Sequence, residues 1–346
     1  MEKITRFLIG TLLFTALFGC SSTPISNSSL QPKNETATQS AEQPTPATAT
    51  AVQTNEIKNP TQIINCSKIA FTLADKSDSE IYTVCSDGSN LKNLTDNPAS
   101  PDFQPAWSPN STRIAFVSSR TGSSQIYVMV ADGRNLLKIT ADAENDFPIW
   151  LPASRGKQIA FRSTDGKGLW WWRIVDIEKF GIVQLTEPSY DFFFQTPDWS
   201  PDGKYMAYMS LMEQKQRNDG SSQIHVKNAD SSNDRALTAD TLANKNPVWS
   251  PDGSKIAFLS ERDGTYDMYA LYVMAKDGLH LQKLTEPVYS ENIRPTWSPD
   301  GKLIAIGNDT GRGSITIIDV ATGNLRDLLR LPDQTEVSEP AWQPDK

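Results

Sequence analysis

The chain has 346 residues with 33 basic and 41 acidic side chains, which gives a formal net charge of −8. This acidic balance argues against nucleic-acid binding, which needs a basic surface, and 38% hydrophobic residues are too few for a multispan membrane protein. Two histidines leave little material for histidine metal sites or general bases, and three cysteines exclude an iron–sulfur cluster that needs four thiolates. We therefore expect no catalytic residues, no metal and no cofactor.

The first residues have the pattern of an export signal. Lys3 and Arg6 precede the apolar run 7–18, which is too short to span a membrane core of about 30 Å as a helix. The run leads into Leu17-Phe18-Gly19-Cys20, which resembles the lipobox of bacterial lipoproteins. The resemblance implies removal of residues 1–19 as a signal peptide and lipidation of Cys20. An ordinary secretory signal and an uncleaved anchor are the alternatives.

Residues 20–61 are expected to form a disordered tether behind the lipidated cysteine. Ser, Thr and Pro dominate this segment, and no aromatic residue occurs between Phe18 and Phe71. Such a composition cannot bury enough apolar surface to offset the entropy lost on ordering. The folded domain is therefore placed at 62–346, with a small folded module in the tether as the alternative.

A Pro-x-Trp motif recurs roughly every 47 residues through the rest of the chain. The Pro-x-Trp marks the first strand, and a Ser-Pro-Asp-Gly turn or a weaker form of it follows most copies. Then come a second strand such as Ile-Ala-Phe, a third strand such as Ile-Tyr, an Asp turn and a fourth strand that ends in Leu-Thr or Ile-Thr. The six copies are Pro105-Ala106-Trp107, Pro148-Ile149-Trp150, Pro197-Asp198-Trp199, Pro247-Val248-Trp249, Pro295-Thr296-Trp297 and Pro340-Ala341-Trp342.

Four short strands per unit, repeated six times, predict an all-β, six-bladed β-propeller. A single four-stranded blade has two apolar faces that must stack on neighbours, and radial closure buries all of them. An open solenoid is the alternative, but it would need capping repeats at its two ends. Here the first unit starts at Ile69 without a Pro-x-Trp, and the last Pro-x-Trp has no strand after it. We therefore expect 340–342 to supply the innermost strand of blade 1, so that the two ends close the ring.

The repeat resembles the TolB-type propeller family, whose units combine Ile-Ala-Phe, Ile-Tyr, Asp-Gly, Leu-Thr and Pro-x-Trp-Ser-Pro-Asp-Gly elements. The resemblance covers about residues 62–345. It implies a noncatalytic propeller of the bacterial cell envelope that binds a protein or peptide on its loop-bearing face or at its channel mouth. TolB itself carries an α/β domain before the propeller, whereas a tether occupies that position here.

The repeat assigns scaffold roles to residues that would otherwise suggest chemistry. The Ser-Pro-Asp triplets are expected to build turns, because an active site is not needed six times. His225 occupies the strand position of Tyr82, Tyr127 and Tyr272, which predicts packing on a blade face. His280 follows Asp277-Gly278 where other units have asparagine, which predicts a turn.

Cys66 and Cys85 fall in the same blade. Antiparallel pairing around a hairpin from Thr72 to Ile81 places position 85 opposite about position 68, within a residue or two of Cys66. A disulfide is permissible in an exported chain. The sequence leaves a Cys66–Cys85 disulfide and free buried thiols as equal alternatives.

Residues that break the repeat are the candidates for binding, because function normally sits on variable loops of a rigid scaffold. Aromatic residues are in excess in blade 3 and the loop behind it. The candidate partner-binding residues are Trp171, Tyr190, Phe192, Phe193 and Phe194. They belong to the face that also receives the insertion 213–222, which we expect to be the binding face. Packing on blade 4 or filling of the channel is the alternative role for the phenylalanines.

The sequence thus predicts a monomeric, lipid-anchored envelope propeller that binds an unidentified envelope protein or peptide. The anchor would hold it at the outer membrane, facing the periplasm, in a Gram-negative cell, or on the outer face of the plasma membrane otherwise. A glycan-binding propeller that uses Trp and Phe as stacking platforms is one alternative. A propeller enzyme, such as a polysaccharide lyase or a peptidase relative, is another.

Overall fold

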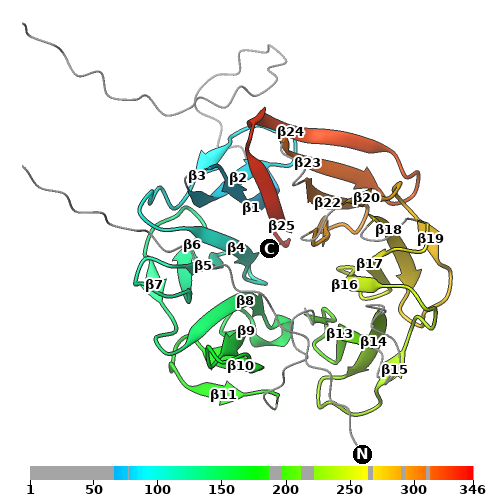
Figure 1. The fold of residues 1–346 in the computed structure, drawn as a ribbon, viewed down its shortest axis with the longest axis horizontal. Coiled ribbons are helices and arrows are strands. Elements are labelled where there is room, and N and C mark those ends of the chain that lie inside the picture. Colours follow the sequence, from blue (N-terminus) through cyan, green and yellow to red (C-terminus); the bar gives the residue numbers. More distant parts are fainter. Residues whose placement is uncertain are drawn as a thin grey trace, which may run out of the picture. The chain divides into compact units, whose positions relative to one another are not determined.

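A computed structural model describes residues 66–76, 78–186, 197–211, 222–263, 268–289, 293–308 and 312–345. These residues form six antiparallel sheets arranged around a central axis, which is a six-bladed β-propeller (Figure 1). A short 3₁₀ helix, Pro152–Ser154, lies between two strands of one blade. Cys20 and the segments assigned to signal and tether lie outside the described residues.

Each blade runs from an innermost strand at the axis to an outermost strand at the rim, which is short in blades 1 to 5 and nine residues long in blade 6. Blade 1 holds β25 (Glu336–Trp342), β1 (Lys68–Ala74), β2 (Ser79–Cys85) and β3 (Lys92–Asn93). Blade 2 holds β4 (Asp102–Trp107), β5 (Arg113–Ser118), β6 (Gln125–Val130) and β7 (Leu137–Lys138). Blade 3 holds β8 (Glu144–Trp150), β9 (Gln158–Thr164), β10 (Trp170–Asp176) and β11 (Ile182–Gln184).

The second half of the ring repeats this order. Blade 4 holds β12 (Asp198–Trp199), β13 (Tyr205–Leu211), β14 (Ser222–Asn228) and β15 (Arg235–Ala236). Blade 5 holds β16 (Asn244–Trp249), β17 (Lys255–Ser260), β18 (Met268–Ala275) and β19 (Gln282–Lys283), with β20 (Val288–Tyr289) also paired to β18. Blade 6 holds β21 (Thr296–Trp297), β22 (Leu303–Asn308), β23 (Arg312–Asp319) and β24 (Leu325–Asp333).

The two ends of the described chain meet in blade 1. The last strand, β25, pairs antiparallel with the first, β1, with Trp342 opposite Ile69 and Val337 opposite Leu73. This is the sheet in which the sequence analysis placed 340–342. Trp342 and Val337 are buried in a cluster that also includes Ile315 and Ile317 of blade 6. The strand therefore completes blade 1 and packs against blade 6.

The strand motifs of the repeat form the core between blades. The aromatic residues of the Ile-Ala-Phe motifs are fully buried at Phe71, Phe116, Phe161 and Phe258. The six motif tryptophans are each less than one tenth exposed and pack into the clusters that join adjacent blades. Burial of these apolar faces is the main favourable contribution to folding of such a ring.

The turn roles expected for the repeat are confirmed. Ser298 Oγ donates to Asp300 Oδ1 at 2.6 Å and accepts from the Leu303 N–H at 2.9 Å, so both side chains tie off the turn between β21 and β22. The same bonds occur after β12 and β16. His280 has a left-handed φ of 55°, like Asn90 and Asn135.

His225 packs on a strand face, as expected. Its ring lies opposite Tyr208 on the neighbouring strand, with 5.6 Å between the ring centroids, and its Nδ1 lies 3.1 Å from Asp234 Oδ1. Neither His225 nor His280 lines the central cavity described below.

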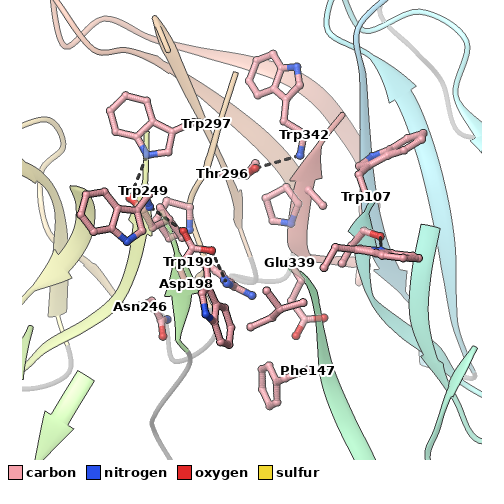
Figure 2. A pocket seen from close by; sticks show the side chains of 18 of the residues that line it. Trp107, Phe147, Asp198, Trp199, Asn246, Trp249, Thr296, Trp297, Glu339 and Trp342 are labelled. Carbon is pink, nitrogen blue, oxygen red and sulfur yellow. Dashed lines mark hydrogen bonds and ion pairs between the residues drawn. The ribbon is translucent and has the colours of Figure 1, made fainter. Parts of the chain in front are cut away.

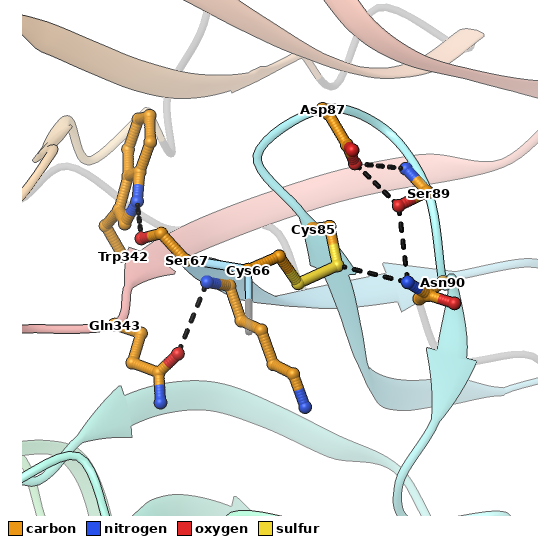
Figure 3. The surroundings of a disulfide bond; sticks show 9 residues. Cys66, Ser67, Cys85, Asp87, Ser89, Asn90, Trp342 and Gln343 are labelled. Atoms are coloured by element: carbon orange, nitrogen blue, oxygen red, sulfur yellow. Dashed lines mark hydrogen bonds between the residues drawn. A yellow bond between two sulfur atoms is a disulfide. The ribbon is translucent and has the colours of Figure 1, made fainter. Parts of the chain in front are cut away.

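Cys66 and Cys85 are joined by a disulfide where the chain enters blade 1, with 5.6 Å between their Cα atoms (Figure 3). Cys85 lies opposite Lys68 in the ladder of β1 and β2, in the register expected from the sequence. The same corner holds the end of β25, because Trp342 Nε1 donates to Ser67 Oγ at 2.8 Å and the Gln343 N–H donates to the Lys68 carbonyl at 2.8 Å. The disulfide thus fixes the segment on which β25 closes.

We expect removal of this disulfide to destabilise the ring without changing its fold. A cross-link that closes a loop of this size restricts the unfolded chain, and its loss costs about 3 kcal/mol. Equilibrium denaturation of the Cys66→Ser, Cys85→Ser double variant would measure the free energy of unfolding against the oxidised parent. The reduced parent serves as the control and should lose a similar amount. An unchanged unfolding midpoint in both samples would contradict the prediction.

Candidate functional site

The six Pro-x-Trp segments surround a cavity of about 1090 Å³ along the propeller axis. Motif residues from all six blades line it (Figure 2). At one end it is bordered by the prolines of the six Ser-Pro or related turns, and we call this end the turn face. At the other end, the loop face, it is lined by Leu211, Ser222, Glu261 and Tyr269, which lie at or next to the loop-side ends of β13, β14, β17 and β18.

In four of the six blades, the proline of the innermost strand sits at a bulge. Proline cannot donate a ladder hydrogen bond, so strands accommodate it at edges or bulges. In blades 1, 2, 3 and 5 the residue before the proline and the proline itself together face one residue of the next strand, which is the buried Phe of Ile-Ala-Phe. The bulged residues are Glu339, Gln104, Phe147 and Asn246.

All four bulged residues have a left-handed backbone, with φ between 50° and 57°. A residue before proline is normally pushed toward extended conformations, and a non-glycine residue held in the left-handed region costs on the order of 1–3 kcal/mol. Bulges of this kind re-aim a side chain and gather at functional sites. Here the re-aimed side chains line the same cavity, and Figure 2 shows Glu339, Phe147 and Asn246 directed toward it.

The bulges are linked from blade to blade. A bulged residue loses the ladder partner of its N–H, and a buried N–H needs another acceptor. Glu339 Oε2 accepts from the Gln104 N–H at 2.9 Å, and Gln104 Oε1 in turn accepts from the Phe147 N–H at 2.7 Å. Side chains of blades 1 and 2 therefore hold the backbone of blades 2 and 3.

A second set of inter-blade bonds uses the middle residue of Pro-x-Trp. Asp198 Oδ2 accepts from the Trp249 N–H at 2.8 Å, and Thr296 Oγ1 accepts from the Trp342 N–H at 3.0 Å (Figure 2). Indole N–H groups also reach the preceding blade, from Trp150 to the Ala106 carbonyl and from Trp297 to the Val248 carbonyl. The cavity wall is thus a hydrogen-bonded, pre-formed surface.

Two carboxylates in the wall have strongly perturbed pKa values. Removal from bulk water raises the pKa of Asp198 to about 6, against the opposing effects of Arg294 and of the Trp249 N–H. Desolvation likewise raises the pKa of Glu339 to about 7, against its hydrogen bonds with Gln104 and the charge of Arg294. Asp198 keeps 22% of its side-chain surface accessible, so it faces the cavity while protein surrounds it. Carboxyl groups with strongly perturbed pKa values cluster at functional sites, which makes these two candidate functional residues.

The described lining carries an excess of acidic groups. Its acidic residues are Asp198, Glu261, Glu339 and Asp345, and its basic residues are Lys245 and Arg294. The Lys245 ammonium lies 3.5 Å from the Tyr269 ring centroid, and Arg294 forms an ion pair with Asp198 at 3.6 Å. Among the described residues, no three His, Cys, Asp or Glu side chains gather closely enough to hold a metal ion.

Most of the candidate binding residues expected from the sequence lie outside the residues that the structure describes. Tyr190, Phe192, Phe193 and Phe194 lie outside the described residues, as does all of the insertion 213–222 except Ser222. Trp171 is described and half-buried in β10. Trp170 and Trp172 share the other face of that strand and pack toward Trp199 of blade 4.

The bulged residues were not singled out by the sequence analysis, although a signal was available. The residue before each Pro-x-Trp differs in chemistry from unit to unit, as Gln104, Phe147, Thr196, Asn246, Arg294 and Glu339. Variation at one fixed place in an otherwise uniform repeat indicates a role other than scaffold.

Comparisons with known proteins agree with this architecture. The family model described as the TolB β-propeller domain matches residues 48–216 and 189–346. Among solved structures, TolB from Acinetobacter baumannii is similar at 23% identity and a TM-score of 0.67, covering 81% of this chain and 67% of that one. Putative TolB from Agrobacterium tumefaciens is similar at 18% identity and a TM-score of 0.57, covering 81% and 100%.

Other propellers share the fold as well. A chain of a nidogen/laminin complex is similar at 14% identity and a TM-score of 0.58, covering 80% of this chain and 98% of that one. Among curated protein sequences, no relative matches the chain significantly. At these identities the solved structures show the fold alone. In the part of the chain that the structure describes, no helix is long and apolar enough to cross a membrane.

Proposed function

The chain belongs to the TolB β-propeller family, and from this premise we propose that it is a noncatalytic, lipid-anchored envelope protein whose central cavity binds a segment of a protein partner. The observation that carries the proposal is the set of chemically different side chains that four strained bulges aim into one cavity of about 1090 Å³. Binding sites of this kind are concave, largely apolar and pre-formed, with a few placed polar groups.

The shape of the cavity favours an extended segment over a compact ligand. Its lining runs from the turn prolines to Glu261 and Tyr269, so it follows the axis from one face toward the other. The loop face is the expected side of approach, because Leu211 and Ser222 border the insertion predicted to take part in binding. Phe192, Phe193 and Phe194 remain candidate contacts on that face.

A bulky label inside the cavity tests the proposal. In a Cys20→Ala background, with Cys66 and Cys85 bonded to each other, Asn246→Cys supplies a single thiol in the wall of the cavity. We expect reaction with fluorescein maleimide to abolish capture of an envelope protein that the unlabelled variant captures from native envelope extract. The labelled and unlabelled proteins are prepared from one batch, and mass spectrometry compares the envelope proteins that each of them captures.

Two controls separate blocking from damage. Leu279→Cys places the same label on an outer turn, where the leucine is 60% exposed, and should leave capture intact. The melting temperature of the Asn246→Cys protein should be the same before and after labelling. A partner captured equally well by both labelled proteins would show that the cavity is not the binding site.

The anchor is tested separately from the cavity. We expect Cys20→Ala to move the protein from the membrane fraction to the soluble fraction while its β circular dichroism and melting temperature are retained, because the tether separates Cys20 from the folded domain. Fractionation followed by immunoblotting measures the change. A Ser21→Ala variant, which keeps the acceptor cysteine, should remain in the membrane fraction. A Cys20→Ala protein that still sediments with membranes would contradict lipid anchoring at this residue.

A further inference from the structure

We propose that the partner segment carries a Lys or Arg side chain that binds in the cavity beside Asp198 and Glu339. This inference rests on the proposed function and specifies the chemistry of its ligand. It follows from how these two carboxylates and the neighbouring Arg294 are placed.

Each carboxylate accepts a backbone N–H hydrogen bond through one of its two oxygens. Glu339 Oε2 accepts both from the Gln104 N–H and from Thr72 Oγ1, at 2.9 and 3.4 Å, and the Gln104 side chain also interacts with this carboxylate. Asp198 Oδ2 accepts from the Trp249 N–H at 2.8 Å, while Oδ1 forms the ion pair with Arg294. The orientation of both groups is therefore fixed while acceptor capacity remains.

The resident cation does not neutralise this pair. Arg294 lies near enough to both carboxylates to lower their pKa values, but its contact with Asp198 is 3.6 Å, longer than a hydrogen bond. One guanidinium beside two carboxylates leaves one negative charge uncompensated when both are ionised. A second cation at this place would complete the charge balance.

The surrounding wall suits the stem of a basic side chain. Phe147 and Trp199 line the cavity with the turn prolines, so the methylene groups of Lys or Arg would contact apolar surface while the charged end reaches oxygen. A phenyl face also attracts a cation. The structure already contains such a pairing, since the Arg162 guanidinium stacks over the Phe147 ring at 4.6 Å from its centroid.

Binding of a cation should be linked to proton release. The raised pKa values of Asp198 and Glu339 mean that these groups are partly protonated in the free protein near pH 6 to 7. A cation favours their ionised forms, so affinity should rise with pH through this range. The other charged or titratable lining groups are Arg294, Lys245, Glu261, Tyr269 and Asp345, which come from other segments of the wall.

A random heptapeptide library displayed on phage tests the inference directly. Phage are first selected for binding to the Cys20→Ala chain, which is the bait. Among the selected peptides, those that bind the unlabelled Asn246→Cys variant but are displaced when this variant carries the fluorescein label form the channel-dependent set. We expect this channel-dependent set to be enriched in Lys or Arg. For a synthetic peptide from the set, replacing Arg by citrulline or Lys by norleucine should weaken binding at least tenfold by calorimetry.

Isosteric variants show whether the two carboxylates are the cause. Asp198→Asn and Glu339→Gln keep an acceptor for the Trp249 and Gln104 N–H groups, so the fold should hold while affinity for the basic peptide falls about tenfold in each. The loss of affinity caused by Asp198→Asn or Glu339→Gln should be non-additive with the loss caused by the citrulline or norleucine replacement in the peptide. Proton release on binding should disappear in the Asp198→Asn, Glu339→Gln double variant. Asp252→Asn with Asp300→Asn, which removes as much charge from the turn face, should change affinity less than twofold.

The outcomes separate this inference from the proposed function. Channel-dependent peptides without a basic preference, or basic peptides unaffected by Asp198→Asn and Glu339→Gln, would overturn the inference and leave cavity binding in place. Peptides that are never displaced by the label would overturn both. Peptides enriched in Glu or Asp would assign the recognition to Arg294 and would also overturn the inference.

Discussion

Deletion of residues 339–346 is expected to unfold the whole propeller. The deletion removes Trp342 and the half of β25 that pairs with Ile69 and Ala70, and it exposes the apolar cluster shared by blades 1 and 6. Loss of one large buried aromatic costs about 3–5 kcal/mol, and the ladder bonds and the Glu339 bond to Gln104 are lost in addition. The sum approaches the total stability of a domain, about 5–15 kcal/mol.

Thermal and chemical denaturation followed by circular dichroism would measure this loss. Deletion of residues 345–346 is the matched control, because it shortens the same end but leaves β25 and the Gln343 contact with Lys68 in place. The control should melt within a few degrees of the parent. If the longer deletion also leaves the melting temperature unchanged, ring closure does not depend on β25.

Replacement of Gly307 by valine is expected to destabilise the propeller severely through a single side chain. A Cβ at this position of β22 would lie 2.5 Å from the Val337 carbonyl oxygen and 3.2 Å from the Ser338 Cα, both backbone atoms of β25. Backbone atoms cannot rotate away as a side chain can, so β25 must separate from blade 6. We expect a loss of at least about 3 kcal/mol of unfolding free energy, at the upper end of overpacking costs.

Equilibrium denaturation of Gly307→Ala and Gly307→Val gives the test, with the valine variant the less stable of the two. Gly181→Ala is the control, since a Cβ there meets nothing within 4 Å and its φ is not left-handed. The control should change stability by less than about 0.5 kcal/mol, as surface substitutions usually do. Equal stability of the Gly307 and Gly181 variants would show that β25 does not pack as closely on blade 6 as the structure has it.

The fold was accessible from the sequence because its signals are local and repeated. Ile69-Ala70-Phe71 and its copies form the second strands, and the Asp-Gly turns place Gly88, Gly133 and Gly278 at left-handed φ values of 87° to 95°. Each unit carries the same types of turn and strand residues. A unit in which the pattern is weak can therefore be interpreted from the units in which it is clear.

The cavity was not accessible in the same way. Strict alternation along a strand assigns each side chain to a face, but a bulge at a proline shifts the residues before it by one position. Gln104, Phe147 and Glu339 therefore point where the period of two does not place them. Their convergence is also a property of the closed ring, because these residues lie far apart in sequence and come together only when six blades pack around one axis.

The position of Glu339 makes the wall of the cavity depend on the last described strand. This residue belongs to β25, which follows every other described strand in the sequence, and its carboxylate anchors the bulges of blades 2 and 3 through Gln104. A chain interrupted during synthesis before this strand would therefore lack both the closed ring and a finished cavity. Truncated molecules would lack the proposed binding site, and a segment bound in that site would in turn protect the intact ring against opening at β25.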